Sequence, residues 1–286
     1  MQSEFMRDAI AALGSTLGPD VLATTIGLFE GEQKALVAQQ PVSDCDISYG
    51  PHERHTLDIY QPALAAEDLS PVLVFVHGGG FLKGDKGSDT HWHNSNVGRM
   101  AARAGYVGVV INYRLAPENT WPSGGEDVAA VVAWLKDNAA QYAGDADNIV
   151  LMGTSAGAVH LSTYLKLNSD TDHVRGLVLL SGLYGFTSMD ERDTAYYGEH
   201  SLYSERAPLD DVVNTALPLL VVCSEFDPPR FQQEFVGLLQ ERLALHNKLP
   251  KALIVSGHNH YSLAMHLGTS DTRLADEIFS FVKKIV

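Results

Sequence analysis

One serine in this sequence is placed for nucleophilic chemistry. The segment Gly153-Thr154-Ser155-Ala156-Gly157 fits the pattern Gly-X-Ser-X-Gly, follows the apolar run 149–152 and opens a stretch of helical character, 156–167. A serine at that point projects from a tight strand-to-helix turn, and the two glycines avoid collisions with the neighbouring strand and helix. The pattern predicts acyl transfer with Ser155 as the nucleophile. The alternative is a glycine-rich turn in which the serine merely caps a helix.

A glycine-rich segment earlier in the chain could stabilise the negative charge of such a reaction. It reads His77-Gly78-Gly79-Gly80-Phe81 and follows the apolar run 72–76. A tetrahedral intermediate needs hydrogen-bond donors set in place for its oxyanion, and glycines let the backbone turn its amides toward one point. We assign this role to the amides of Gly79, Gly80 and Ala156. We expect His77 to be structural, because it precedes this loop and the base follows the serine in this chain order.

The serine also needs a base and a carboxylate that orients the base. Two acidic residues, Glu225 and Asp227, follow the apolar run 219–223. Asp227 is preferred, because the Pro228-Pro229 pair that follows it ends the strand and fixes the loop. Glu225 is the weaker candidate.

Three histidines follow the last apolar run, 252–255. His260 is the preferred base and His258 the second choice, whereas His266 is expected in the following helix with a structural role. Elsewhere, His91-Trp92-His93 places two histidines two residues apart, but a metal site would need further ligands nearby. We therefore expect no metal and no cofactor.

These motifs together resemble the α/β-hydrolases of the hormone-sensitive-lipase-like type, bacterial esterase family IV. The resemblance covers nearly the whole chain from about residue 55 onward, and the segments that carry it are His77–Phe81, Tyr113-Arg114-Leu115-Ala116-Pro117-Glu118, Glu126-Asp127-Val128 with Trp134-Leu135, Gly153–Gly157 and Glu225-Phe226-Asp227-Pro228. The family places its histidine in a Gly-X-X-His arrangement, which Gly257-His258-Asn259-His260 matches, so the resemblance favours His260. It also supports Asp227 as the acid and Gly79, Gly80 and Ala156 as oxyanion donors.

The sequence departs from the family at one position near the nucleophile. Thr154 stands where many members carry Asp or His. The start of the following helix, residues 156–160, resembles the kynurenine formamidase branch of the family. The resemblance implies a serine carboxylesterase that hydrolyses small esters with short-to-medium acyl chains through an acyl-enzyme. The alternatives are an arylformamidase or amidase with the same triad, and a non-catalytic small-molecule binder.

The elements that must position these residues alternate along the chain. Strands are predicted at 57–60, 72–76, 107–112, 149–152, 177–180, 219–223 and 252–255, and helices at 126–138, 156–167, 231–245 and 272–285. Short apolar runs separated by helices indicate an α/β fold with a mostly parallel sheet. With the resemblance, this predicts an α/β-hydrolase domain over 41–286 with about eight strands flanked by helices.

Two further segments are expected to cover the site. Residues 1–40 form a small N-terminal helical cap, and 184–215, which have no clean period, form a second cap element. Leu82, Trp92, Tyr184 and Phe186 are candidates for lining the substrate pocket. For each of these four, ordinary core packing is the competing interpretation.

Composition excludes some functions. The chain has 20 Lys and Arg against 35 Asp and Glu, a formal charge of −15, which disfavours nucleic acids and acidic membrane surfaces as partners. The chain has two cysteines, too few for a disulfide framework. Reduced cysteines are typical of proteins in a reducing compartment. With no signal peptide and no apolar span in the sequence, we expect a cytoplasmic protein that acts on a small ester, and a homodimer is possible.

Overall fold

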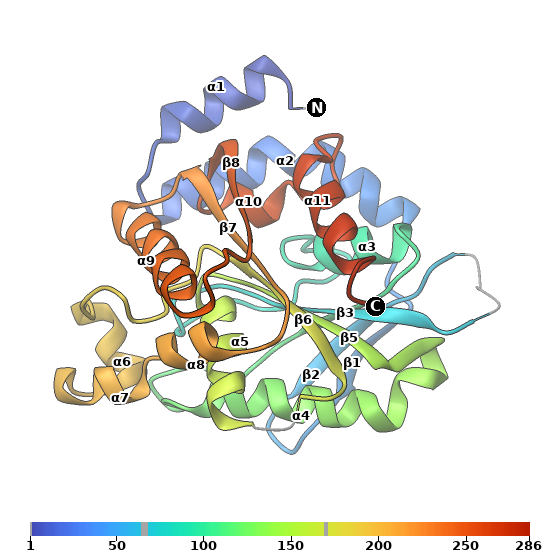
Figure 1. Cartoon of the computed structure of the whole chain (residues 1–286). Coiled ribbons are helices and arrows are strands. Elements are labelled where there is room, and N and C mark those ends of the chain that lie inside the picture. The colour runs from blue at the N-terminus through green and yellow to red at the C-terminus, as the bar shows by residue number, and fades with distance from the viewer. Residues whose placement is uncertain (1, 64–67, 169–170) are drawn as a thin grey trace.

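An eight-stranded sheet forms the centre of the computed structural model (Figure 1), which describes residues 2–63, 68–168 and 171–286. Its strands are β1 (Asp44–Ser48), β2 (Thr56–Tyr60), β3 (Ser70–Val76), β4 (Val107–Ile111), β5 (Gly144–Thr154), β6 (Val174–Leu180), β7 (Leu219–Phe226) and β8 (Lys251–Asn259). Their spatial order is β1-β2-β4-β3-β5-β6-β7-β8. The pairs β1–β2 and β2–β4 are antiparallel, and the strands from β4 across to β8 pair in parallel.

Helices cover both faces of the sheet. The α-helices are α1 (Glu4–Leu13), α2 (Pro19–Gln39), α3 (Ser95–Arg103), α4 (Ser123–Asn138), α5 (Ala156–Leu167), α6 (Thr194–Tyr197), α7 (Tyr203–Arg206), α8 (Leu209–Asn214), α9 (Pro229–His246), α10 (Ser262–Met265) and α11 (Arg273–Val282). The 3-10 helices are η1 (Ala139–Tyr142), η2 (Glu191–Asp193) and η3 (His200–Leu202).

Alternation along the buried strands sets the two cores. In β3, Val72, Val74 and Val76 belong to an apolar core that also includes residues of α4, α5, α8 and α9. Leu73 and Phe75, which point the other way, belong to a second core that includes residues of α3, α10 and α11. Because both faces are covered by helices, these central strands are apolar throughout, as the sequence predicts.

The predicted α/β-hydrolase architecture of a mostly parallel sheet with flanking helices is confirmed. Two elements escape the sequence analysis. Strand β1 is short and largely exposed, so it lacks an apolar run. Helix α3 begins directly after Asn94 and carries few large apolar residues, although most of it is buried.

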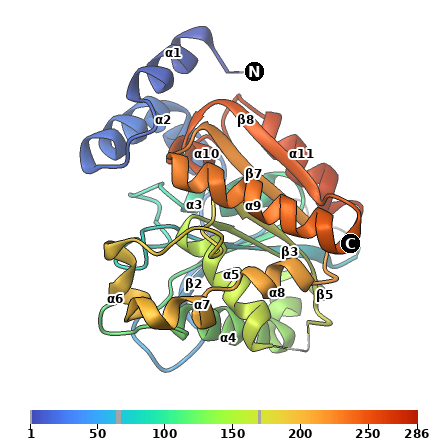
Figure 2. The ribbon, with the colours of Figure 1, turned by 60° about the vertical axis from the view of Figure 1, so that its left-hand side comes forward.

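Helix α1 packs against β8, and helix α2 packs against α3 and α10 (Figure 2). The side-chain amide of Gln33 in α2 is buried and donates to the carbonyls of Met265 and Leu267, at 2.7 and 3.0 Å. Among the described residues, no helix has the length and apolar character needed to cross a bilayer.

Residues 184–215 form a run of short helices, with α6 and α7 well away from α1 and α2 in Figure 2. A buried carboxylate ties the start of this run to α9. The oxygens of Glu234 accept hydrogen bonds from the amides of Tyr184, Gly185, Phe186 and Thr187, and from the Thr187 hydroxyl. A segment without periodicity is therefore held by polar contacts to a distant helix.

Candidate active site

Ser155 occupies the turn between β5 and α5 with φ 53° and ψ −120°. This is a strained conformation for a residue with a side chain, of the kind that accumulates at functional sites. The flanking glycines are required sterically. A Cβ on Gly153 would lie 2.6 Å from the backbone of Gly157, and a Cβ on Gly157 would lie 2.0 Å from the carbonyl oxygen of Val76.

The preferred base and acid are in contact. Nδ1 of His260 lies 2.7 Å from Oδ1 of Asp227, and both side chains are buried. The loop after β7 carries the acid and the loop after β8 carries the histidine, and these parallel neighbours end at the same edge of the sheet. With Nδ1–H donating to the carboxylate, the other ring nitrogen, Nε2, is left as the proton acceptor.

Asp227 is held as an anion by several donors. Its second oxygen, Oδ2, accepts from Ser181 Oγ at 2.5 Å and from the Ser224 amide at 2.7 Å, with the thiol of Cys223 at 3.2 Å. Burial alone would raise the pKa of Asp227, but the hydrogen bonds from His260, Ser181 and Ser224 outweigh burial and lower it below its ordinary value. Ser181 was not singled out in the sequence. The available signal was its place directly after β6.

Ser155 and His260 line one cavity of about 630 Å³, together with Gly78, Gly79 and Gly80. The structure therefore brings the predicted nucleophile, the predicted base and the glycine-rich loop to one cavity. Phe231 also lines it, and its ring lies 4.2 Å from the His260 ring between centroids.

The glycine-rich loop follows β3 and has the backbone geometry of a donor site. Gly79 and Gly80 have φ values of 136° and 60°, and a Cβ on Gly79 would lie 1.8 Å from the carbonyl oxygen of Lys83. Within the described part of the chain, the amides of these two glycines donate no hydrogen bond. Ala156 begins α5, so its amide lies at the positive end of the helix. These three amides stay the predicted donors to an oxyanion beside Ser155.

His77 lies behind this loop rather than in the cavity. It is fully buried, its Nδ1 contacts the Gly78 carbonyl at 2.6 Å, and its ring stacks on Tyr113 at 4.3 Å between centroids. Burial lowers its pKa to about 4. Its place is that of a structural imidazole that supports the loop.

The model of the BD-FAE family matches residues 57–222. The chain belongs to the BD-FAE family. The resemblance to esterases of the hormone-sensitive-lipase-like type is thereby confirmed at the level of the family.

Two curated relatives from Mycobacterium tuberculosis are similar to this member of the BD-FAE family. The probable carboxylic ester hydrolase LipM is 34% identical over 207 residues, which are 63% of this chain and 47% of LipM. The carboxylesterase NlhH is 39% identical over 99 residues, 35% of this chain and 30% of NlhH. The chain thus matches about half the length of LipM, and less of NlhH.

Solved structures share the fold at lower identity. An arylesterase structure superposes with a TM-score of 0.69 at 18% identity, covering 98% of this chain and 96% of the arylesterase. A hyperthermophilic esterase from Pyrobaculum calidifontis gives a TM-score of 0.64 at 24% identity, with 99% and 98% covered. At these identities the likeness establishes the fold of this BD-FAE member alone.

The other acid and base candidates make different contacts. Glu225 is exposed and accepts from the Gly257 amide at 2.7 Å, which shapes the loop that carries His260. His258 is buried and its Nε2 lies 3.2 Å from Asp271. The structure therefore pairs neither of them with a triad partner.

His258, His266 and Asp271 form a buried group of metal-ligating types, with their ligand atoms within 4.8 Å of one another. Arg273 donates to both carboxylate oxygens of Asp271, at 2.8 and 2.7 Å, and the two imidazoles stack at 3.9 Å between centroids. Stacked rings do not point their nitrogens at a common centre, and the guanidinium already supplies the cation for this carboxylate. We therefore read the group as a polar network under the His260 loop.

Of the four residues predicted to line the pocket, the structure places one there. Leu82 lines the cavity. Trp92 and Tyr184 are buried in apolar clusters, and Phe186 is 42% exposed, and none of these three is among the residues that line the cavity. Tyr184 and Phe186 instead belong to the segment held by Glu234.

The cavity wall comes mostly from residues that the sequence analysis did not single out. Apolar side chains line it from α2, its preceding turn, α9 and the α10 region: Leu17, Leu22, Ile26, Phe231, Tyr261, Ala264 and Met265. Charged side chains in the wall are Lys83, Asp85 and Arg192. No local pattern marks these residues, since they converge from distant parts of the chain.

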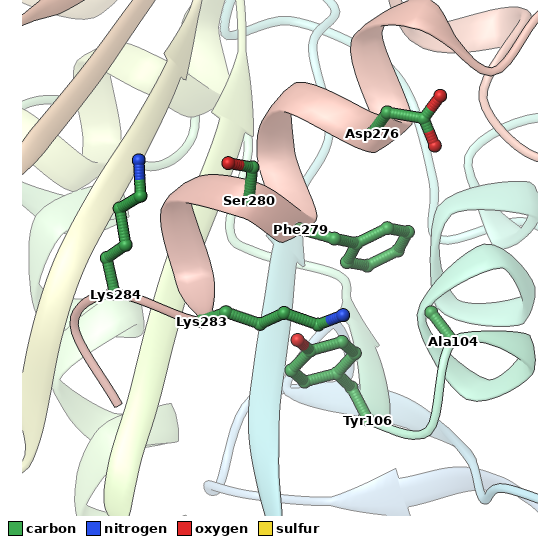
Figure 3. A pocket seen from close by; sticks show the side chains of 7 residues that line it. All are labelled: Ala104, Tyr106, Asp276, Phe279, Ser280, Lys283 and Lys284. Carbon is green, nitrogen blue, oxygen red and sulfur yellow. The ribbon is translucent and has the colours of Figure 1, made fainter.

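A second hollow of about 560 Å³ lies beside α11 and the loop before β4 (Figure 3). The rings of Tyr106 and Phe279 stack in it at 5.3 Å, and the side chains of Lys283 and Lys284 extend from the end of α11. It contains none of the predicted catalytic residues. The candidate active site is therefore the cavity that holds Ser155.

Proposed function

We propose that this chain is a serine carboxylesterase that hydrolyses small esters with short-to-medium acyl chains. Ser155 Oγ attacks the ester carbonyl while His260 Nε2 takes its proton, and Asp227 stabilises the imidazolium that forms. The oxyanion receives hydrogen bonds from the amides of Gly79, Gly80 and Ala156. On collapse the alcohol leaves with the proton from His260, and water activated by the same imidazole releases the acid from Ser155.

The observation that carries this proposal is the 2.7 Å contact between His260 and Asp227 beside a cavity that Ser155 also lines. Such a contact is not needed to hold the sheet together, and it orients a base toward the nucleophile's side. The strained φ of Ser155 supports the same role.

The size and wall of the cavity support the substrate class. A volume of about 630 Å³ suits a small molecule, and the wall is mainly apolar. An acyl chain of modest length would contact Leu17, Leu22 and Met265. The names of LipM and NlhH, a probable carboxylic ester hydrolase and a carboxylesterase, favour ester over formamide hydrolysis.

The experiment compares Ser155→Ala with Ser280→Ala, which alters an exposed serine outside the cavity. We expect Ser155→Ala to lower kcat on p-nitrophenyl butyrate by about 10⁴-fold or more, the scale of triad removal, and Ser280→Ala to retain wild-type turnover. A fluorophosphonate probe should label wild type and Ser280→Ala but not Ser155→Ala. If Ser155→Ala turned over the substrate as fast as the wild type, Ser155 would not be the nucleophile.

The rival activities are separated in the same assays. Parallel rates on p-nitrophenyl butyrate and N-formylkynurenine distinguish an esterase from an arylformamidase. A non-catalytic binder would hydrolyse neither substrate and would leave the probe unreacted.

Two further proposals rest on separate features. Cys45 and Cys223 are unpaired, which supports a cytoplasmic location testable by cell fractionation. Helix α1 covers part of the edge strand β8, and the part that carries the exposed Ile254 favours a homodimer, which sedimentation equilibrium would detect.

A further inference from the structure

One cation lies beside the glycine-rich loop of the predicted oxyanion site. Arg192, in η2, lines the cavity with Ser155 and His260. A Cβ on Gly80 would lie 3.9 Å from both Nε and Cζ of Arg192, so the guanidinium faces the loop that holds the oxyanion donors. The acyl-transfer scheme gives this guanidinium no role.

The charge of Arg192 is incompletely neutralised. Its Nε and Nη2 lie 3.3 and 3.2 Å from Oδ1 of Asp193, long contacts for a charged pair. Asp193 is buried, and its other oxygen, Oδ2, accepts from Arg230 at 2.6 Å, so one carboxylate serves two guanidiniums. Arg230 has a second partner in Asp190, also at 2.6 Å. Arg192 Nη1 donates no hydrogen bond within the residues that the structure describes, and its side chain is 45% exposed to the cavity and solvent.

The rest of the cavity wall does not cancel this charge. Lys83 adds a second cation, and among the residues that the structure describes Asp85 is the one carboxylate in the wall. Asp85 accepts from the Gly87 amide at 2.7 Å and lies 3.7 Å from His91. Burial lowers the pKa of His93 to about 4, so that imidazole is neutral at pH 7. The described side chains of the wall thus include two cations against one carboxylate, while the shared carboxylate of Asp193 lies against Arg192.

We propose that Arg192 is a specificity-determining residue that binds an anionic group, a carboxylate above all, on the ester substrate. The inference rests on the proposed function, since it names the substrate class of that same site. A planar guanidinium with a free Nη1 and a partly shared Nη2 can donate two parallel hydrogen bonds to a carboxylate. Because Arg192 lies beside Gly80, a carboxylate bound to it would be a few bonds from the scissile carbonyl. The carboxylate can belong to the acyl part or to the alcohol part, and the assay separates these sources.

The test uses two matched substrate pairs. For the acyl side, mono-p-nitrophenyl glutarate is compared with p-nitrophenyl butyrate, and for the alcohol side, 4-acetoxybenzoate is compared with phenyl acetate. The variants are Arg192→Met, which keeps the aliphatic stem, and Lys83→Met and Arg175→Met as controls. Lys83 is the other cation of the wall, whereas Arg175 is an exposed arginine bonded to Asn148 outside the cavity.

We expect Arg192→Met to lower kcat/KM for the anionic member of at least one pair about 10-fold or more beyond its effect on the neutral member, mainly through KM. For each ester, kcat/KM of the variant is divided by kcat/KM of the wild type, so the intrinsic reactivity of the ester cancels. The wild-type advantage should also shrink as NaCl is raised, because an exposed ion pair is screened. Arg175→Met should leave both ratios unchanged, and unchanged melting temperatures in all variants exclude misfolding.

Three outcomes would overturn the inference. Arg192→Met could affect anionic and neutral members equally, the selectivity could follow Lys83→Met instead, or salt could leave the wild-type ratios unchanged. These results differ from failure of the proposed function, in which wild type would hydrolyse neither neutral ester and would not react with the fluorophosphonate probe.

Discussion

A buried histidine behind the nucleophile predicts how this protein loses stability in acid. His160 lies on the second turn of α5, is fully buried, and contacts the rings of Phe81, Tyr113 and Tyr196. Within the described part of the chain its Nε2 has no hydrogen-bond partner, and its Nδ1 lies 3.4 Å from the Tyr196 hydroxyl. Burial lowers its pKa to about 3, so the imidazole is neutral in the folded protein.

The size of the effect follows from proton linkage. In the unfolded chain a histidine has its ordinary pKa of about 6.5, so between that value and about 3 the unfolded state binds a proton that the folded state does not. The free energy of unfolding therefore falls as the pH falls, with a limiting slope of about 1.4 kcal/mol per pH unit. From pH 7 to pH 5, His160 alone accounts for a loss of about 2 kcal/mol, since the slope is reached only below pH 6.5.

The perturbation is His160→Leu, which places an apolar side chain of similar size among the same rings. Urea unfolding followed by tryptophan fluorescence at pH 7, 6 and 5 gives the free energy of unfolding of each protein. We expect the wild type to lose about 2 kcal/mol more than His160→Leu over this range. The control is His200→Leu, at an exposed histidine, which should lose stability in parallel with the wild type.

Parallel losses in wild type and His160→Leu would refute the reasoning, because they would mean that His160 takes up its proton equally well in both states. His77, His93 and His266 are also held neutral by burial, with pKa values lowered to about 4, 4 and 3. They add acid sensitivity to both proteins equally and do not alter the difference between them. The wild type should therefore unfold steeply below pH 6.

Two more predictions concern polar contacts that hold the site. Ser181→Ala removes the hydroxyl that donates to Asp227, so kcat on p-nitrophenyl butyrate should fall about 10-fold with little change in KM. The fall should be larger than in the control Cys223→Ala, which removes a weaker donor to the same carboxylate. Equal rates in the two variants would contradict this prediction. Glu234→Gln replaces one of the oxygens that accept from residues 184–187 by an NH2 donor. The free energy of unfolding, measured by urea unfolding, should fall by about 2 kcal/mol. If the loss were no larger than in Glu241→Gln, on the same helix, other contacts would hold the segment.

How far the sequence predicts the site depends on the range of the contacts. The turn at Ser155 and the loop at Gly79 and Gly80 are encoded by adjacent residues, because each needs a glycine where the backbone closely approaches another segment. The meeting of Asp227 with His260 is long-range, but it was predicted from chain order and the family resemblance.

The cavity wall could not be predicted in the same way. Leu17, Tyr261 and Arg192 meet because α2, the β8–α10 loop and η2 pack around one opening, and no local period marks that convergence. Tyr184 illustrates the opposite error. As an aromatic in an irregular segment it suggests a pocket residue, yet its side chain belongs to the core under α5 and α9. Burial of a large side chain is decided by tertiary packing, which the sequence of the segment does not contain.

Both sides of the cavity are anchored by polar bonds whose loss would leave buried groups unpaired. On one side, Gln33 ties α2 to the carbonyls of Met265 and Leu267, and the Gly18 amide donates to the Tyr261 hydroxyl at 3.1 Å. Comparable bonds from Glu234 and Asp193 secure the opposite side. An opening movement would break several such bonds at once, each at a cost of about 1–3 kcal/mol, so the cavity is formed before a substrate arrives. Selectivity must then come from the side chains already in the wall, and among these the incompletely paired Arg192 offers the strongest discrimination between a charged and a neutral ester.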